Sequence, residues 1–366
     1  MNTKIITSSE VWMEGLAINQ FNKAAELEGV VNAVAFPDLH PGKGIPVGVA
    51  FITRNKIYPH LIGNDIGCGI VLWQTDIKIH KIKLDKWVKK LENFSDCDCN
   101  CEEILAQHGL PGDLYVDAIG TIGSGNHFAE IQQIETVVNA ELFEALKLDR
   151  KLALIMVHCG SRGFGNYILR KHVDAYGAMG LDPDTGAGHD YITEHDKACS
   201  WALANRQAVA EKLMLLTGAN STPVNDAMHN MIEPLNDGQW IHRKGAVKAT
   251  DKPVVIAGTR GDLSYLVIPV ASGESNAFSL AHGAGRKWKR NEAKGRMSHK
   301  YRPDSLVQTG LGSRVICHDR ELLYEEAPQA YKRIETVIKA LANAGLIDVI
   351  ATLKPLITLK KGKDKL

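Results

Sequence analysis

The sequence predicts an α+β fold, a single integrated domain over residues 1–366 in which mixed β-sheets are flanked by helices. Short β-type runs and amphipathic helical segments are interleaved along the chain. The 366 residues could accommodate two domains, but no internal repeat and no clear linker divides them. These observations favour one domain built from several layers of sheet and helix.

The composition is that of an ordinary globular protein, with 45% hydrophobic residues, 23% charged residues and a formal net charge of +1. This balance excludes a histone-like blanket of positive charge, although local basic patches are possible. The seven cysteines are an odd number, the first residues do not resemble a signal peptide, and no apolar run is long enough to span a bilayer. We therefore expect a cytoplasmic protein without structural disulfides and without a membrane partner.

The first third of the chain predicts a helix followed by β-strands. A short helix is expected over 18–27, and the run 30–36 is expected to form a strand that Pro37 ends, followed by a loop over 38–44. The other elements expected here are strands over 47–53, 57–61 and 70–77 and a helix over 84–94. Strands therefore lead into and out of the loop at 63–69.

The middle of the chain predicts a strand that is buried on both faces and a long helix. Residues 151–157 form a continuous apolar run that ends at His158, as in a strand covered on both sides. Thr193 and Asp196 resemble a capping box that opens a helix reaching Leu216. The other elements expected here are a regular element over 128–134, a helix over 166–175 and a loop over 180–188.

Two polar residues interrupt the apolar face of that long helix. Asn205 and Arg206 lie at its centre, between Ala202 and Val209 of the apolar stripe. Polar side chains in such positions are either satisfied inside the protein or aimed at a ligand, and the sequence leaves both possibilities open.

The last third predicts strands, basic segments and one further helix. Pro328 suits the first position of a helix that reaches Leu341 and is stopped by Gly345. The basic run over 286–302 is either a solvated surface loop or a strip that binds nucleic acid. The remaining elements expected here are a basic loop over 240–246 and strands over 253–257, 263–270, 349–353 and 356–359.

The glycine-rich segment 63–69 is the first candidate functional site, because it carries the carboxylate of Asp65 and the thiol of Cys68 three residues apart. Taken alone, this pattern favours a tight turn with a buried cysteine. Three further glycine-rich segments each carry a histidine, namely His127, His158 and His282. This repeated association of glycine turns with potential ligands favours a metal centre built from loops.

Two other groups of potential ligands are given a structural interpretation. Cys97, Cys99 and Cys101 lack the usual C-x-x-C spacing and have no histidine close by, so a zinc site is disfavoured there. His40 is expected to bond its own backbone and not to bind a metal.

Six motifs occur in the order found in RtcB-type RNA ligases, which the chain resembles from about residue 38 to its Lys-rich tail. They are Asp65-x-x-Cys68, Gly125-Asn126-His127-Phe128, His158-x-Gly160-Ser161-Arg162-Gly163, His229-Asn230, His242-Arg243-Lys244-Gly245-Ala246 and His282-Gly283-Ala284-Gly285-Arg286. The resemblance implies an RtcB-like fold whose metal centre lies on strand-end loops. It also implies an enzyme that uses GTP and two Mn²⁺ ions to join an RNA 3′-phosphate or 2′,3′-cyclic phosphate to a 5′-hydroxyl, in RNA repair or tRNA splicing.

The resemblance further implies roles for individual residues. The metal ligands are matched by Asp65, Cys68, His127, His158 and His229. His282 matches the catalytic histidine that becomes guanylylated, and Arg162 and Arg286 match groups that face the RNA. The positions around the guanylate are matched by Asn126, Glu130, Asn230, Gly258, Thr259, Ser264, Gly283, Gly285 and Lys361.

The chain also departs from the family pattern. It has Ala257-Gly258-Thr259-Arg260-Gly261 where the family commonly has Pro-Gly-Ser-Met-Gly, which places an extra cation beside the guanylate pocket. Together with the basic Lys287-Trp288-Lys289 segment, this indicates a divergent branch, which suggests repair of damage-cleaved RNA. Two alternatives remain: a phosphoesterase that opens cyclic phosphates without ligation, which would not need His282, and a non-catalytic RNA-binding accessory factor.

Overall fold

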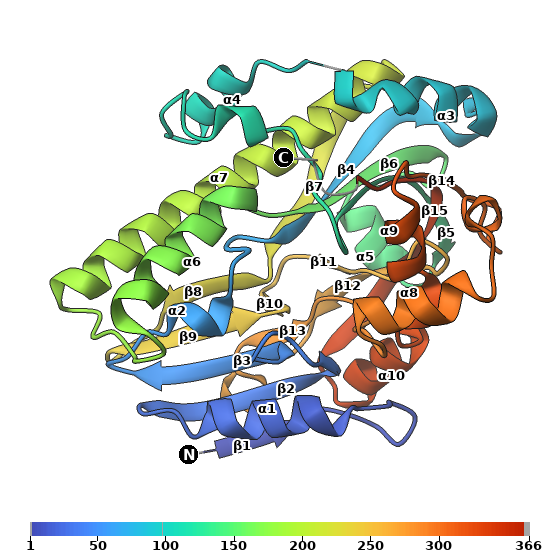
Figure 1. The fold of residues 1–366 in the computed structure, drawn as a ribbon. Coiled ribbons are helices and arrows are strands. Elements are labelled where there is room, and N and C mark those ends of the chain that lie inside the picture. The colour runs from blue at the N-terminus through green and yellow to red at the C-terminus, as the bar shows by residue number, and fades with distance from the viewer. Residues whose placement is uncertain (1, 97, 362–366) are drawn as a thin grey trace.

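The computed structural model describes residues 2–96 and 98–361 and shows three β-sheets with helices packed around them (Figure 1). Two of the sheets are large, with five and eight strands, and the third is a two-stranded ribbon. The α+β class with mixed sheets is therefore confirmed. In the described part of the chain, no helix combines the length and the apolar character that crossing a membrane requires.

The five-stranded sheet lies beside the N-terminus and has the order β1, β2, β3, β9, β8. β1 runs parallel to β2, and the other neighbours are antiparallel. Helix α1 (Gly15–Ala25) packs on it by burying Ala17, Phe21 and Ala24 against Phe51 and other sheet residues (Figure 1). The strands span Asn2–Ile5 (β1), Val30–His40 (β2), Val47–Arg54 (β3), Gln239–Lys244 (β9) and Asn230–Pro234 (β8).

The eight-stranded sheet has the order β11, β12, β15, β5, β6, β4, β7, and β14 pairs with β15 off this path. The β14–β15 pair is parallel and the others are antiparallel. The strands are Val254–Ile256 (β11), Ser264–Pro269 (β12), Ile347–Leu359 (β15), Phe128–Val137 (β5), Leu152–Cys159 (β6), Gly69–Lys78 (β4), Ser221–Met228 (β7) and Arg314–Ile316 (β14). The ribbon pairs β10 (Ala246–Lys248) with β13 (Ser279–Ala281).

The helices cover these sheets, and the long α7 packs against β6 and β4. In Figure 1, α6 and α7 lie side by side across one end of the molecule. The helices span Pro59–Ile62 (α2), Leu84–Leu91 (α3), Cys101–Gln107 (α4), Ala140–Ala145 (α5), Arg162–Tyr176 (α6), Gly186–Thr217 (α7), Arg290–Ser298 (α8), Arg320–Glu325 (α9) and Ile334–Asn343 (α10).

Several predicted elements are confirmed. β6 is the buried strand expected over 151–157, because seven of its eight residues are buried between β5 and β4. The strand over 47–53 corresponds to β3, and the helix over 84–94 to α3 with a 3₁₀ turn after it. The helices over 18–27 and 166–175 and the strands over 70–77, 253–257 and 263–270 correspond to α1, α6, β4, β11 and β12, and the regular element over 128–134 is strand β5.

Two predictions in the first third of the chain are wrong because of prolines. The strand over 57–61 is instead the short helix α2, which begins at Pro59, since proline suits the first helical turn. Pro37 does not end its strand: β2 continues to His40, and the pairing with β3 shifts register between Ala35 and His40. A proline is tolerated at such an irregularity because no regular ladder hydrogen bond is lost there.

The predicted start of the long helix is also wrong. The Thr185 side chain accepts a hydrogen bond from the Gly188 backbone N–H (3.3 Å), so the helix begins at Gly186, inside the loop expected over 180–188. Thr193 therefore lies within the helix. Tertiary packing explains the extra turns, because Tyr191 is fully buried in the core beneath them.

Three predictions in the last third also need correction. The basic loop over 240–246 is mostly strand β9, which is paired on both sides and buries His242 and Arg243. Pro328 opens a 3₁₀ turn, and the helix starts only at Ile334. The strands over 349–353 and 356–359 form one strand, β15, because register shifts in its pairing with β5 accommodate Pro355.

The cysteines that the structure describes are free thiols: Cys68, Cys99, Cys101, Cys159, Cys199 and Cys317. In the C-x-C-x-C segment, Cys99 and Cys101 place their Sγ atoms 3.2 Å apart. Cys97, the third member of that group, lies outside the described residues.

Candidate metal centre and nucleophilic histidine

Four strands of the eight-stranded sheet bring the predicted metal ligands to one edge. Cys68 immediately precedes β4, His127 precedes β5, His158 lies near the end of β6, and His229 follows β7. Because β4 is antiparallel to β6 and β7, and β5 is antiparallel to β6, the starts of β4 and β5 meet the ends of β6 and β7. Asp65 reaches the same edge from the turn before Cys68. This arrangement agrees with a centre on strand-end loops.

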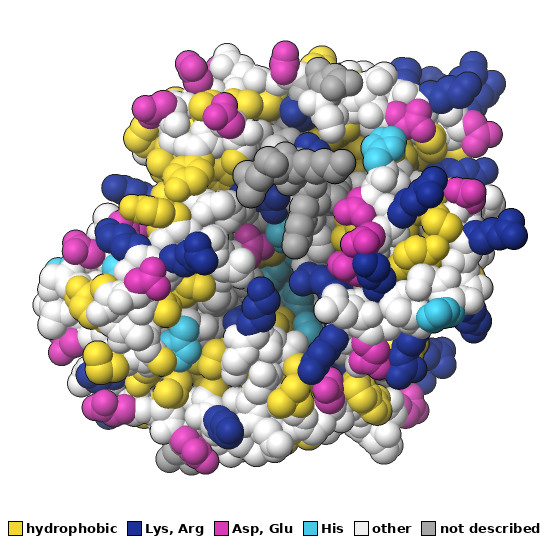
Figure 2. All heavy atoms as spheres, viewed as in Figure 1, with side chains coloured by type: hydrophobic (Ala, Val, Ile, Leu, Met, Phe, Trp, Pro, Cys, Tyr) yellow, Lys and Arg dark blue, Asp and Glu magenta, His cyan; other side chains and the backbone are white. Residues whose placement is uncertain are grey.

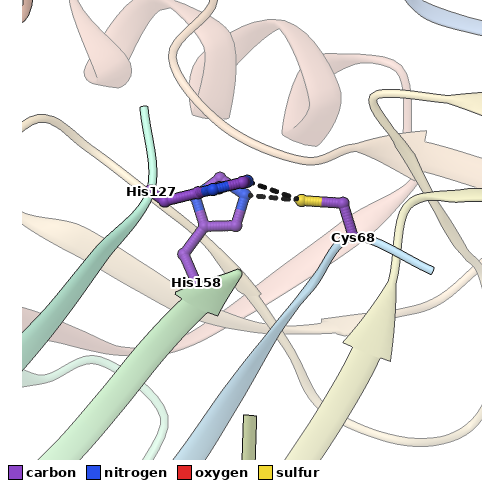
Figure 3. Close-up of side chains that lie close together, drawn as sticks. All are labelled: Cys68, His127 and His158. Atoms are coloured by element: carbon purple, nitrogen blue, oxygen red, sulfur yellow. Dashed lines mark hydrogen bonds between the residues drawn. The ribbon is translucent and has the colours of Figure 1, made fainter. Parts of the chain in front are cut away.

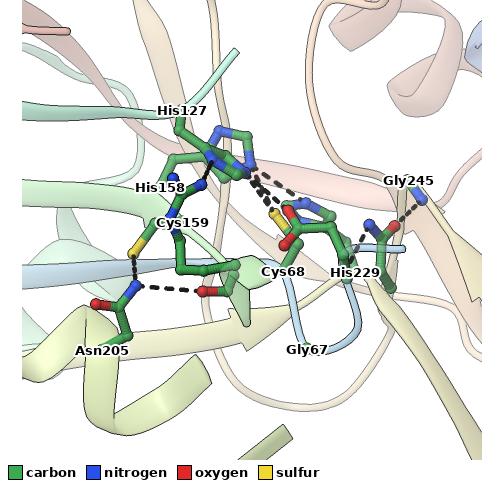
Figure 4. Close-up of polar contacts among 12 residues, drawn as sticks. Gly67, Cys68, His127, His158, Cys159, Asn205, His229 and Gly245 are labelled. Atoms are coloured by element: carbon green, nitrogen blue, oxygen red, sulfur yellow. Dashed lines mark hydrogen bonds and ion pairs between the residues drawn. The ribbon is translucent and has the colours of Figure 1, made fainter. Parts of the chain in front are cut away.

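The side chains of these residues form one continuous set of contacts. Cys68 Sγ lies 3.4 Å from His127 Nε2 and 3.3 Å from His158 Nε2 (Figure 3). His158 Nε2 is 3.3 Å from His229 Nε2 (Figure 4). His127 Nε2 is 2.8 Å from Asp65 Oδ2. The five potential ligands are therefore linked by contacts, and the ligand atoms of Cys68, His127 and His158 all lie within 4.8 Å of one another.

The donor set fits a bound transition metal. Burial, reinforced by neighbouring imidazoles, lowers the pKa of His158 and of His229 well below the usual range, so both rings present neutral nitrogens. Burial raises the pKa of the Cys68 thiol, which makes the thiolate dependent on a nearby cation. Thiolate, imidazole and carboxylate together bind divalent first-row metals.

The carboxylate in this set is ionised and tightly placed. Burial alone would raise the pKa of Asp65, but His127, together with the Cys68 thiol and Arg162, outweighs it and lowers that pKa to about 2. A Cβ atom at Gly160 would lie only 2.3 Å from Asp65 Oδ1. The absence of a side chain at this glycine therefore makes space for the carboxylate.

His282 lies beside the cluster and is held by Asp38. Its Nδ1 is 2.7 Å from Asp38 Oδ2, and its backbone N–H donates to the same oxygen (3.3 Å). The ring centroid of His282 is 4.6 Å from that of His229. With Nδ1–H donating to the carboxylate, the free lone pair of a neutral imidazole is at Nε2.

Asp38 is a functional candidate that no sequence motif identified. It lies in β2, is fully buried, and is 244 residues from His282 in the sequence. The sequence marked Asp38 only by its place in the loop before His40. No spacing pattern links it to His282, because the two residues are so far apart in the chain. His40 bonds backbone as expected, because its Nδ1 lies 2.8 Å from the carbonyl oxygen of Asp38.

One cavity of about 1440 Å³ joins most of the predicted site residues. Figure 2 shows histidines inside a hollow whose rim carries Lys and Arg side chains. The predicted residues that line this cavity are Asp65, Cys68, Asn126, Glu130, His158, His229, Asn230, Gly258, Thr259, His282, Gly283, Gly285 and Arg286. His127 joins the site through Asp65 and Cys68.

Glu130 and the turn at Gly258, which were predicted to contact the nucleotide, both line the cavity. Glu130 accepts hydrogen bonds of 2.6 Å from both Thr358 and Gln132. Ser264 is buried, and its hydroxyl accepts the Gly258 N–H (3.1 Å), so it holds the turn that lines the cavity.

Lysines and the extra arginine add positive charge to the cavity. Lys360, whose neighbour Lys361 was the predicted contact, lines the cavity and donates to the His127 carbonyl (2.9 Å). Burial lowers the pKa of Lys360 and that of the cavity residue Lys244 to about 8 each. Arg260, the departure from the family pattern, also lines the cavity and donates to the Leu323 carbonyl (2.8 Å).

Asn230 and Arg162 hold the ligand-bearing loops. The Asn230 amide donates to the Asp65 carbonyl (3.2 Å) and accepts the Gly245 N–H (2.8 Å). Arg162 places Nη1 3.5 Å from His127 Nδ1. Its φ of 58° is rare for a non-glycine residue, and such strain is concentrated at functional sites.

Arg286 matches a residue that faces the RNA in the family, but here its guanidinium is hydrogen-bonded to other groups of the protein. Its guanidinium donates to Glu326 (2.9 Å), to the Tyr331 hydroxyl (3.0 Å) and to the Glu325 and Trp288 carbonyls (2.7 and 3.1 Å). These bonds anchor the start of the basic run, which continues as helix α8. Lys287, Trp288, Lys289 and Arg290 line the cavity next to Arg286.

Burial of Glu130 predicts a pH dependence of stability. Burial raises its pKa to about 7, although its hydrogen bonds act in the opposite direction. Because the folded pKa lies above the unfolded value, this contribution to stability is present at low pH and is lost as pH rises through about 7. From about pH 5 to about pH 8, we expect wild type to lose about 2 kcal/mol relative to Glu130→Gln in urea unfolding. A pH-independent difference between the two proteins would contradict this assignment.

The site belongs to the class of metal-dependent enzymes that act on phosphate groups, because its soft donors suit divalent cations and its lysines and arginines suit phosphate. The family model described as "tRNA-splicing ligase RtcB" matches residues 20–108 and 113–361. The chain therefore belongs to the RtcB family of RNA ligases, as its motifs predicted. Membership implies the use of GTP and a metal.

The similarity to individual relatives is uneven. The chain is 46% identical to RNA-splicing ligase RtcB2 of Escherichia coli, over 98% of this chain and 96% of the relative. It is 30% identical to RNA-splicing ligase RtcB of Mycobacterium tuberculosis (92% and 99% covered) and 27% identical to tRNA-splicing ligase RtcB of Archaeoglobus fulgidus (94% and 91% covered). This contrast agrees with a distinct branch of the family.

Proposed function

We propose that this protein joins an RNA 3′-phosphate, or a 2′,3′-cyclic phosphate that is first opened, to an RNA 5′-hydroxyl through a guanylylated His282. The observation that carries the proposal is the Asp38–His282 pair, with Nδ1 and Oδ2 2.7 Å apart, next to His229 of the thiol–imidazole cluster. A nucleophile beside a potential metal centre distinguishes a guanylyl-transfer enzyme from one that only hydrolyses phosphates.

His282 has the arrangement that a nucleophilic imidazole requires. Asp38 accepts a hydrogen bond from Nδ1–H, which leaves the Nε2 lone pair free to attack the α-phosphorus of GTP. A P–N bond forms at Nε2 as the bond between the α-phosphorus and the pyrophosphate oxygen breaks. The Asp38 carboxylate stabilises the positive charge that develops on the ring.

We propose Asp65, Cys68, His127, His158 and His229 as the ligands of two Mn²⁺ ions. When bound, such ions orient nucleophile and leaving group and neutralise charge on the phosphate oxygens. The choice of manganese rests on the family resemblance, because these donors would bind Zn²⁺ at least as tightly.

The later steps need room for two RNA ends, and the cavity supports this. Its volume of about 1440 Å³ exceeds the roughly 300–1,000 Å³ of ordinary small-molecule sites. In these steps the RNA 3′-phosphate takes the guanylate from His282, and the 5′-hydroxyl then displaces GMP to form the phosphodiester. Arg162 and the cavity residues Lys244, Lys287 and Lys289 are the cations that we assign to RNA phosphates.

Incubation with α-labelled GTP and Mn²⁺ tests the proposal. A ligase of this kind acquires a protein-bound label that is acid-labile, as expected of a P–N bond, and releases it as GMP when both RNA ends are supplied. A phosphoesterase would open cyclic phosphates and acquire no label, and an accessory factor would do neither, so each alternative gives its own result.

The role of Asp38 gives a further prediction. Asp38→Asn keeps the size of the side chain but favours the wrong tautomer of His282, so guanylylation should slow by about 10²-fold or more. The GTP concentration at half-maximal rate should change much less, because Asp38 contacts the nucleophile. Rates of label incorporation at several GTP concentrations measure both quantities. A wild-type rate would remove Asp38 from the mechanism.

We further propose damage-cleaved RNA as the physiological substrate, on the basis of the departures at Arg260 and at the 287–289 segment. The test compares the sealing of nicked ribosomal RNA with the sealing of tRNA halves under identical conditions. A strong preference for tRNA halves would contradict this assignment.

A further inference from the structure

The centre of helix α7 carries two polar side chains in an otherwise apolar environment. Asn205 and Arg206 have no exposed surface. The residues around them, Ala202, Ala208 and Val209, are also buried and belong to the core. Burying an arginine removes its hydration, and an ion pair in such a place adds little stability over well-packed apolar side chains. A different advantage must therefore explain their position.

Arg206 connects the loops of two potential metal ligands. Its Nη1 donates to the Gly67 carbonyl (2.7 Å) and to the Cys159 carbonyl (3.0 Å), which belong to the residues next to Cys68 and His158. Its Nε donates to both carboxylate oxygens of Asp226 (3.0 Å each), in the strand that leads to His229.

Asn205 makes the matching connection to the loop of His127. Its Nδ2 donates to the carbonyls of Thr121 (3.1 Å) and Gly160 (3.2 Å), and its Oδ1 accepts the Thr121 N–H (3.2 Å). Thr121 opens the glycine-rich segment that ends at His127. Figure 4 shows Asn205 below the cluster, with one of its contacts reaching the sulfur of Cys159.

The loop of Cys68 also rests directly on this helix. Gly67 has φ of 72°, and a Cβ atom there would lie 2.9 Å from both Cys199 Cα and Ala202 Cβ of α7. Backbone contact and side-chain hydrogen bonds therefore act at the same point. The segments that carry Cys68, His127, His158 and His229 are all tied to one turn of one long helix.

We propose that Asn205 and Arg206 are positioning residues of the metal centre, which set the spacing of its ligand-bearing segments through backbone groups and Asp226. The inference rests on the proposed metal-binding function. A guanidinium presents several donors in a fixed plane, so one side chain holds two carbonyls and a carboxylate at once. A lysine retains the charge but cannot reproduce this geometry.

Metal affinity of the full-length protein tests the inference. We compare wild type with Arg206→Lys and Asn205→Ala by calorimetric titration with Mn²⁺ and by Co²⁺ titration, in which a thiolate ligand produces a charge-transfer absorption band. Arg243→Lys is the matched control, because Arg243 is also fully buried and pairs with a carboxylate, Glu233 (2.7 Å). Its other side-chain hydrogen bonds reach Ser279 and the Phe278 carbonyl, and not the segments that carry the four ligands. Thermal unfolding of the metal-free proteins measures the structural effect of each change.

We expect Arg206→Lys and Asn205→Ala to weaken metal binding by about tenfold or more, as changes next to metal ligands commonly do. Arg243→Lys should bind metal with wild-type affinity, even though its melting temperature should fall by about as much as that of the α7 variants. Wild-type affinity in both α7 variants would overturn the proposal, and so would equal weakening in the Arg243 control. Failure of the wild type to bind either ion would instead contradict the metal centre itself.

Discussion

His282→Ala is expected to abolish protein labelling by α-labelled GTP, a loss of more than about 10³-fold, and with it the sealing of RNA that ends in a 3′-phosphate. The reason is that no other histidine shares its geometry of a ring nitrogen bonded to the buried Asp38 carboxylate next to His229 in the described structure. Removal of a covalent nucleophile cannot be compensated by its neighbours. Gel-based detection of the labelled protein measures the effect.

A preactivated substrate provides the control for this variant. RNA that already carries the guanylate on its 3′-phosphate no longer needs the histidine nucleophile, so His282→Ala should still join it to a 5′-hydroxyl strand. Labelling of His282→Ala at the wild-type level would place the guanylate on another residue. Loss of both reactions together with a lowered melting temperature would indicate a folding defect.

Cys68→Ala is expected to have the broader effect and to abolish guanylylation, sealing of 3′-phosphate RNA and sealing of preactivated RNA. Its sulfur lies 3.3–3.4 Å from two histidine nitrogens of the cluster, so its loss removes the ligand that connects them. In the proposed reaction, all the steps are displacements at phosphorus, which bound metal ions would assist. Rates with the two RNA substrates distinguish this pattern from that of His282→Ala.

Cys199→Ala is the matched control for the Cys68 variant. Cys199 is also a buried thiol, but it lies on α7 near His195 and outside the cluster. It should retain guanylylation and sealing, whereas wild-type rates of either reaction in Cys68→Ala would remove Cys68 from the metal site.

The sequence predicted the presence of individual helices and strands better than the residues at which they begin and end. The buried strand β6 was recognisable because an uninterrupted apolar run leaves few alternatives. The start of α7 was not, because Thr185 and Thr193 both offer capping side chains and the buried Tyr191 decides between them. Similarly, Pro59 looks like part of an apolar strand until its place at a helix start is known.

The candidate site was predictable where a motif carries the chemistry and unpredictable where distant segments meet. Asp65, Cys68 and the histidines stand in recognisable glycine-rich motifs, and the structure brings them together. Asp38 is one member of a pair separated by 244 residues, so no local pattern identifies it. For Arg286, the motif gave the position, but only the fold shows that its donors bond Glu326, Tyr331 and two backbone carbonyls.

Anomalous diffraction from crystals soaked with Mn²⁺ and GTP is the decisive test of the proposed metal centre, because it locates the metal independently of any activity. We predict manganese peaks within bonding distance of Cys68 Sγ and His158 Nε2, and density for a guanylate joined to His282. Manganese bound elsewhere, with Cys68 and the cluster histidines free of metal, would contradict it.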